Sequence, residues 1–420
     1  MTKQHDKSTN GATLVRRLLV VQTIAGLAQW LDVFLIFSIP SFLWKSSPTE
    51  IALLASFFGL PSLFFGPIVG AYLDRTDPRK TMMAGALART ILTLFIAFTH
   101  SFPSFALLVL LKGLANLLYW PSSSIVTNHV VREAARVKYF SSLSVLDQIT
   151  KIATPLLAGA VTLAINSQLT FLISAGATLI CAALLPRLNV AVEFTPLEQR
   201  RSVEGLLKDL FQGLRSIRTL PPRLLLSVAL GIGMSLTLAI YDPHLAAYLG
   251  SNGFDASVFS MVLSATAVGA VVGAALIRFA FNEASPLALI RAGVAAFTTA
   301  LLTMAILVSV TPGLLGCGTL VLMWFLNGLG YEVFIVGCSV NMQNLCPPAL
   351  LGRMNTSVRS LQMTTVVLGP SLGAWLITAQ SRATPFVASA AFALLLLGIV
   401  IIFGYTPERA ARAVSGSENS

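Results

Sequence analysis

Charged side chains are scarce in this chain. Asp, Glu, Lys and Arg make up 11% of its 420 residues, and the mean hydropathy is +0.80. A soluble globular domain carries about 25% charged residues, so the composition excludes an ordinary soluble fold. The apolar residues, 55% of the total, form long blocks. Blocks of about 20 residues can each cross a hydrocarbon core about 30 Å thick. The sequence therefore predicts an all-α membrane protein.

Acidic residues are fewer than basic ones, which gives a net charge of +11. A basic excess can indicate nucleic-acid binding. Here, however, Lys and Arg fall in short loops between apolar blocks, and no basic patch alternates with aromatic residues. The positive-inside rule explains such a distribution, since cytoplasmic loops collect Lys and Arg. We expect the lipid bilayer, and no nucleic acid, as a partner.

Cysteine and histidine are rare, with four residues of each. The scattered cysteines exclude a disulfide framework, and the absence of CxxC spacing argues against a metal site. The sequence also has no P-loop and no Ser nucleophile motif, which disfavours nucleotide binding and catalysis. We expect a protein that is not an enzyme and that needs no cofactor, metal or nucleotide.

Twelve apolar blocks are long enough to cross a membrane. We place them at residues 18–44, 50–73, 81–99, 104–127, 141–165, 168–186, 224–249, 256–280, 287–310, 313–338, 356–379 and 384–404. Of the 28 Lys and Arg residues, only Lys45 and Arg382 fall in the odd-numbered loops. Both termini should therefore be cytoplasmic, in the cytoplasmic (inner) membrane of a bacterium.

The longest segment between the blocks divides the chain into two halves. We expect an N-terminal six-helix bundle at 1–186, a cytoplasmic linker at 187–223, and a C-terminal six-helix bundle with a short tail at 224–420. Within the linker, apolar residues from Leu206 to Ile217 recur at helical spacing, which predicts an amphipathic helix on the membrane surface. A plain linker explains this composition, and a regulatory segment is the alternative.

The two halves repeat one another. Small or helix-bending residues recur in the same order and role, as expected for bundles related by a pseudo-two-fold axis along the membrane normal. The matched pairs are Gly113 with Gly328, Pro155 with Pro370, and Arg89 with Arg291. Gly70–Arg75 and Gly273–Arg278 likewise close corresponding blocks.

One loop carries a family resemblance. The run Gly70-Ala-Tyr-Leu-Asp74-Arg75-Thr-Asp77-Pro-Arg79-Lys80 resembles the signature of the major facilitator superfamily, although Tyr72 and Asp77-Pro78 depart from it. The resemblance implies alternating access between two six-helix bundles. It also implies that Asp74 caps a helix and pairs with a cation, while Arg75, Arg79 and Lys80 form a cytoplasmic latch. The alternative is a turn whose charges only set the topology.

Shorter segments resemble one branch of that superfamily. Leu31-Asp32, the turn Lys45–Thr49 and Leu60-Pro61 are similar to the macrolide-efflux and enterobactin exporters. This resemblance implies export of a drug or a siderophore-like metabolite. Two departures soften the implication: Val109 stands where antiporters often carry Arg, and Thr154–Gly159 is only a partial antiporter motif.

Ionisable groups inside membrane spans are candidates for function, because each costs about 2.5–3.5 kcal/mol on insertion scales. We assign proton coupling to Asp32 and Glu332. The helix of Asp32 lines the central cavity in the resembled fold, and no basic residue lies within one turn of it. A carboxylate there could load and release a proton. The alternative is a structural hydrogen-bond partner for Gln29 or a hydroxyl.

Five further residues are our candidates for binding substrate: Asp147, Lys151, Asp242, His244 and Tyr331. Asp147 and Lys151 share a helix face, so they either neutralise each other or leave Lys151 for a substrate carboxylate. In Asp242-Pro243-His244, the proline interrupts the helical ladder, so the backbone there could line a cavity or an external gate.

These features together predict a secondary transporter, expected to be monomeric, that exports a small organic compound by proton antiport. The alternatives are a proton-coupled uptake symporter or a lipid flippase on the same fold. A non-transporting membrane sensor is a further alternative, supported only by the long central linker.

Overall fold

The computed structural model describes residues 2–73, 76–187, 222–281, 283–310, 315–345 and 348–403. This part of the chain is helical and contains no strand. Its long helices are α1 (Thr2–Ser38), α2 (Pro48–Leu73), α3 (Pro78–Ala97), α4 (Phe102–Val130), α5 (Glu133–Ala164), α6 (Ser167–Leu184), α8 (Pro222–Tyr241), α10 (Ala256–Phe279), α11 (Pro286–Ser309), α12 (Cys317–Leu345), α13 (Pro348–Ala379) and α14 (Thr384–Phe403). They correspond one by one to the twelve predicted spans, so the predicted fold class is confirmed.

Two helices have irregular continuations on the side of the protein opposite the start of α1. A π-helix, η1 (Ile39–Leu43), extends α1, and a 3-10 turn, η3 (Asp242–His244), joins α8 to the short helix α9 (Leu245–Ser251). We call this side, with its loops at 44–47, 252–255 and 380–383, the far side, and the opposite one the terminal side. The turn at η3 agrees with the predicted break at Pro243.

Eleven of the helical segments are long and apolar enough to cross a membrane. The exception among the twelve long helices is α5, which carries Asp147, Lys151 and many hydroxyl side chains. Its polarity is compatible with a spanning helix only where its polar face meets other protein or a water-filled cavity. The sequence of α5 thus indicates a helix that faces the interior.

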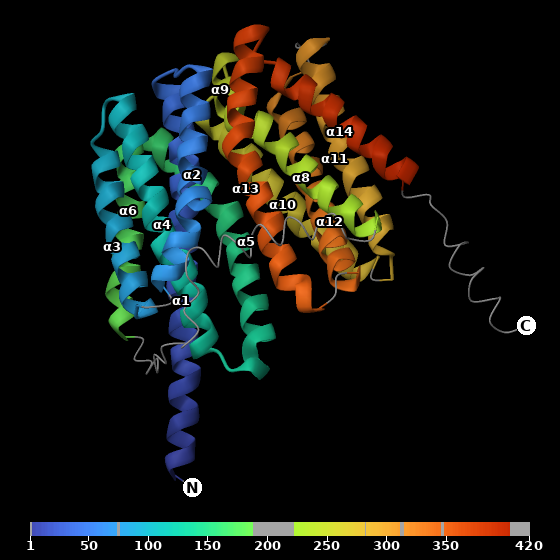
Figure 1. Ribbon diagram of the computed structural model, residues 1–420. Coiled ribbons are helices and arrows are strands. Elements are labelled where there is room, and N and C mark those ends of the chain that lie inside the picture. Colours follow the sequence, from blue (N-terminus) through green and yellow to red (C-terminus); the bar gives the residue numbers. More distant parts are fainter. Residues whose placement is uncertain are drawn as a thin grey trace, which may run out of the picture.

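The helices form two bundles that lie side by side, α1–α6 and α8–α14 (Figure 1). Their internal packing follows the predicted repeat. A Cβ atom on Gly113 of α4 would lie 2.8 Å from Cγ of Pro61 on α2, and one on Gly328 of α12 would overlap the carbonyl oxygen of Thr266 on α10. Glycine at both positions lets the paired helices approach closely.

The bundles meet along two seams, α2 against α13 and α5 against α10. A hydrogen bond crosses each seam: Ser56 Oγ donates to the carbonyl of Val367, and Ser264 Oγ donates to that of Ile152, both at 2.7 Å. Each serine is the ninth residue of its helix, and each carbonyl lies three residues before a matched proline, Pro370 or Pro155. The pseudo-two-fold symmetry therefore extends to the seams.

An aromatic contact closes the far half of the interface. The ring of Phe259 on α10 stacks on Phe34 at 5.7 Å between centroids and meets Phe42 at 6.2 Å. Both partners belong to the first helix and its π-helical extension. The bundles are therefore packed together on the far side.

Two predicted features lie outside the described residues. They are the amphipathic helix predicted from Leu206 to Ile217 and the residues Asp74 and Arg75 of the resembled loop. The linker boundaries and the roles of these two residues remain predictions.

Candidate functional site

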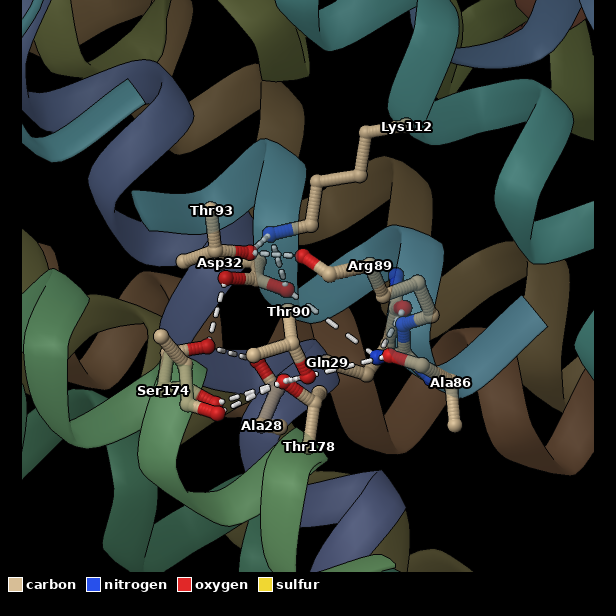
Figure 2. A network of polar contacts seen from close by, with 11 residues as sticks. Ala28, Gln29, Asp32, Ala86, Arg89, Thr90, Thr93, Lys112, Ser174 and Thr178 are labelled. Carbon is tan, nitrogen blue, oxygen red and sulfur yellow. Dashed lines mark hydrogen bonds and ion pairs between the residues drawn. The ribbon is translucent and has the colours of Figure 1, made fainter. Parts of the chain in front are cut away.

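A network of buried charges occupies the interior of the N-terminal bundle, and Figure 2 shows it from close by. At its centre is Asp32 of α1, which is 1% exposed. Its Oδ2 lies 2.7 Å from Nζ of Lys112 on α4 and 4.0 Å from the guanidinium of Arg89 on α3. Its Oδ1 accepts a hydrogen bond from Ser174 Oγ on α6 at 2.6 Å. One carboxylate thus connects four helices.

The two cations have few other polar partners. The Lys112 ammonium also donates to Thr93 Oγ1, and Arg89 donates to Gln29 Oε1 at 3.3 Å. The Arg89 guanidinium lies 5.1 Å from the ring centre of Tyr119, where a cation–π contact is favourable. Nε and NH1 of Arg89 are buried and have no hydrogen-bond partner. Its positive charge is therefore stabilised mainly by Asp32 and the aromatic ring.

The network contains one acid and two bases. Buried charges are costly unless paired, and the second cation is left without an anion of its own. The fold itself does not require this arrangement. At the repeat position of Lys112, the C-terminal bundle has Asn327, whose Nδ2 donates to Tyr241 Oη at 2.9 Å. Because a neutral pair fills the equivalent place, the charges of the N-terminal bundle are candidates for function.

The position of Asp32 differs from the sequence-based expectation. We expected it to face a cavity without a nearby base, but it is buried in the bundle beside two bases from other helices. Sequence spacing could not show this, since Lys112 and Arg89 approach from α4 and α3. The sequence nevertheless marked both bases as unusual. Lys112 is a cation inside a predicted span, and Arg89 is one member of a pair repeated between the halves.

A second group of charges involves both bundles. Lys151 of α5 places its ammonium 5.2 Å from the ring centre of Trp30 on α1. It is also close enough to interact electrostatically with Asp242 and Glu332 of the C-terminal bundle. The structure thus brings together three of the predicted site residues from both halves of the protein.

Asp147 does not form the pair with Lys151 that was one of the two sequence-based alternatives. No ion pair joins them among the described residues; Lys151 turns toward Trp30 instead. Asp147 is exposed and lines a hollow of about 320 Å³ together with Gln22, Ser123 and Thr127. The floor of this hollow is ordered, since Gln22 Nε2 donates to both hydroxyls at 2.8 Å.

His244 and Tyr331 lie deeper than expected for groups that line an open cavity. His244 is buried, and its Nε2 is 2.9 Å from the carbonyl oxygen of Pro370, where it can donate. Tyr331 is half-buried and packs against Phe297 and Phe334. These contacts give both residues a packing role, while substrate binding by them remains a prediction.

Part of the predicted latch is described. Asp77 caps α3 by accepting from the backbone N–H of Arg79 at 2.9 Å, and its Oδ1 lies 3.5 Å from Nε of Arg79. Lys80 is exposed. In this state Arg79 is therefore held by an acid of its own turn, and the latch across the bundles remains a prediction.

Comparison with known proteins agrees with this architecture. The Major Facilitator Superfamily profile matches residues 18–319, which is more than half of the chain. The chain belongs to this superfamily. A relative in Bacillus subtilis (strain 168), described as the uncharacterized MFS-type transporter YfiS, is 21% identical over 396 residues. The alignment covers 92% of this chain and 92% of the relative. The match supports a superfamily transporter without naming a substrate or a branch.

Several solved transporters have the same fold. A mutant of the nucleoside transporter NupG superposes with a TM-score of 0.75 at 15% identity, over 92% of this chain and 99% of that one. A POT family transporter in complex with 5-aminolevulinic acid gives 0.73 at 12% identity, over 93% and 95%. A bacterial homolog of the human lysosomal transporter Spinster, in an inward-facing and unoccupied conformation, gives 0.71 at 12% identity, over 93% and 96%. At these identities the likeness shows the superfamily fold alone.

Proposed function

We propose that this superfamily transporter exports a small organic compound, such as a drug or a siderophore-like metabolite, across the cytoplasmic membrane by proton antiport. The observation that carries the coupling part of the proposal is the buried network of Asp32, Lys112 and Arg89, which has no charged counterpart at Asn327. An ion pair of Asp32 with Lys112, where the other bundle has an asparagine at the repeat position of the lysine, suits a coupling device better than a scaffold.

In the proposed cycle, Asp32 receives the proton. A proton on this carboxylate would remove the anion that Lys112 and Arg89 share, and would leave two cations facing each other in a buried site. Coulomb repulsion is strong where water is excluded. Relief requires α1, α3 and α4 to shift relative to one another. Such a shift would bias the equilibrium between the two arrangements of the bundles.

Substrate would bind between the bundles, at the charges that both halves contribute. Lys151 and Trp30 offer a cation and an aromatic face, which suit an amphiphilic compound with a carboxylate. Asp242 and Glu332 face them from the other bundle within electrostatic range of Lys151. We also assign Glu332 a role in proton coupling. A substrate carboxylate bound to Lys151 would neutralise the positive charge that otherwise acts on Glu332, and this would change how readily Glu332 takes up a proton.

The observed state fits the loading step of an exporter. The seam hydrogen bonds and the Phe34–Phe259 stack hold the far-side halves together. With the termini in the cytoplasm, as the Lys and Arg distribution predicts, the packed far side would face outward, as a loading state reached from the cytoplasm requires. Closing that access would use the predicted latch of Asp74, Arg75, Arg79 and Lys80.

Direction is tested by accumulation in whole cells. A deletion strain and a strain that overproduces the protein would be compared for retained drugs and excreted metabolites, with and without a protonophore. Export predicts lower accumulation in the overproducer, and the protonophore should abolish the difference. Protonophore-sensitive accumulation above the deletion strain would instead support the uptake symporter.

Coupling is tested with purified protein in proteoliposomes, using the compound found in cells. Asp32→Asn should abolish transport driven by a pH gradient while substrate binding persists. Glu283→Gln is the matched control, because Glu283 is an exposed acid outside the membrane spans. If Asp32→Asn transports as well as Glu283→Gln does, Asp32 is not the coupling group.

A further inference from the structure

A hollow on the far side of the protein is separate from both groups of charges described above. It has a volume of about 810 Å³ and is lined by both bundles, through η1 and the Lys45 turn on one side and α9, the loop before α10 and Arg382 on the other. Below it, Phe42 contacts Gly250, and the Phe34–Phe42–Phe259 contacts close the seam. The hollow therefore faces outward from the packed side.

Positive charge is concentrated there. Lys45 and Arg382 are the only Lys or Arg residues in the far-side loops by sequence, and both line this hollow. They belong to different bundles, so it is the tertiary structure that places both in the lining of one hollow. Lys45 has a φ of 51°, in the left-handed region that side chains other than glycine rarely adopt. Lys45 follows the C-cap of η1, and the N–H of Ser46 closes this helix end by donating to the carbonyl of Pro40 at 2.8 Å, so the conformation belongs to the helix terminus.

A buried hydroxyl without a partner also belongs to this hollow. Ser41 of η1 is 5% exposed, lines the hollow, and its Oγ makes no hydrogen bond. Buried polar groups are normally paired, so an unpaired one at a cavity wall indicates a position for a ligand atom. A hydroxyl donates readily to an anionic oxygen, which agrees with the sign of the nearby charges.

The one acid in the lining does not cancel the two cations. Asp255 caps α10: its Oδ1 accepts from the backbone N–H groups of Ser257 at 3.0 Å and Val258 at 3.2 Å, and from the Ser257 hydroxyl. Its negative charge is thus used at the helix N-terminus. The apolar wall formed by Ile39, Phe42 and Phe254 would suit a hydrocarbon body attached to an anionic head group.

We propose that this hollow is a second binding site, on the far side of the closed seam, for an amphiphilic organic anion. A carboxylate or a comparable head group binds between Lys45 and Arg382 and accepts from Ser41, and its apolar body lies against η1 and Phe254. The site is distinct from the one between Lys151 and Glu332 and can be occupied while the far-side seam is packed.

The test is equilibrium binding to the full-length protein in detergent, measured by isothermal titration calorimetry. Every titration uses the Lys151→Gln background, because Lys151 and Trp30 offer a carboxylate site of their own between the bundles. The probe is 2-naphthoate, and the uncharged control ligand is 2-naphthamide. We expect naphthoate to bind at least tenfold more tightly than the amide. The double variant Lys45→Gln/Arg382→Gln should lose that preference, and Ser41→Ala should weaken naphthoate binding severalfold. Arg278→Gln, which removes an exposed arginine at the opposite end of α10, should leave binding unchanged.

Location is tested by filling the hollow. Ala247 of α9 lines it, so Ala247→Trp should prevent naphthoate binding, while Asp147→Asn, which alters the hollow beside Gln22 in the N-terminal bundle, should not. Unfolding temperatures of all variants would be measured to confirm that they fold. Equal affinity for naphthoate and naphthamide, or naphthoate binding in the double variant equal to that in Arg278→Gln, would overturn the proposal. Transport is not needed for this measurement, so it can fail or succeed independently of the proposed export.

Discussion

Nζ of Lys112 lies 2.7 Å from Oδ2 of Asp32, while Asn327, at the repeat position of Lys112, donates to the hydroxyl of Tyr241. The two bundles therefore solve the same packing problem with an ion pair in one half and a neutral hydrogen bond in the other. Since the neutral solution is available to the fold, the ion pair has an energetic cost that the scaffold did not need to meet. We therefore expect the Asn327–Tyr241 pair to stabilise the scaffold and the Asp32–Lys112 pair to respond to protons.

Removing the one acid of the buried network should be more harmful than removing all three charges. Asp32→Asn leaves Lys112 and Arg89 buried without an anion, and breaking a buried pair costs about 3–5 kcal/mol. The triple variant Asp32→Asn/Lys112→Met/Arg89→Met should recover most of that loss. Thermal unfolding in detergent would measure both, with the exposed Lys80→Met as control. A triple variant no more stable than Asp32→Asn would contradict the pairing.

A glycine at a close helix contact should tolerate substitution by alanine less well than a glycine with open space around it. Gly328→Ala places a methyl group onto the Thr266 carbonyl, a backbone atom that cannot move aside, so folded yield should fall sharply. Gly398→Ala on α14 meets nothing within 4 Å and should be neutral or stabilise the helix by up to about 1 kcal/mol. Yield and monodispersity by size-exclusion chromatography would compare them. A well-folded Gly328→Ala protein would show that α10 and α12 are further apart than described.

The seam serines should set the balance between the two arrangements of the bundles. Ser56→Ala and Ser264→Ala each remove one inter-bundle hydrogen bond, worth about 0.6 kcal/mol on average within membrane proteins. Each should lower the ratio of molecules packed on the far side to molecules open there by about twofold to threefold, and both together by more. Distance distributions between spin labels on α2 and α13 would show this. Ser124→Ala, which loses a bond only within its own helix, is the control and should cause no change.

The cap of α10 should respond to acid. Hydrogen bonds from the Ser257 hydroxyl and from the backbone N–H groups hold the pKa of Asp255 below its usual range. A lowered folded-state pKa contributes stability above the unfolded pKa of about 4, and that contribution is lost as the pH falls through the folded value. Unfolding temperatures between pH 3 and 6 should therefore drop less steeply for Asp255→Asn than for the wild type. Parallel curves would show that the cap does not titrate.

The sequence predicts the scaffold well because its signals are local. Apolar blocks, Gly113 with Gly328, and Pro155 with Pro370 each specify a span or a contact without knowledge of distant residues. The resembled loop correctly indicated the superfamily.

The sites were harder to predict, because they depend on which helices meet. Asp32 has no base within its own turn, yet Lys112 and Arg89 reach it from α4 and α3. Helical spacing left a pair of Lys151 with Asp147 as one of two alternatives, but Lys151 lies over the ring of Trp30 on a neighbouring helix instead. His244 contacts Pro370, more than a hundred residues away in the chain. No pattern within a single helix contains these contacts.

The seam hydrogen bonds end on main-chain oxygens, at Val367 and Ile152, and this has a consequence for how the protein can change over evolutionary time. A carbonyl is present whatever side chain its residue carries. Positions 152 and 367 are thus free to vary in shape and polarity without loss of the acceptor, whereas the donors Ser56 and Ser264 are not. A lineage adapting to a new cargo could alter the helix faces beside Pro155 and Pro370 and still keep its two halves closing in register.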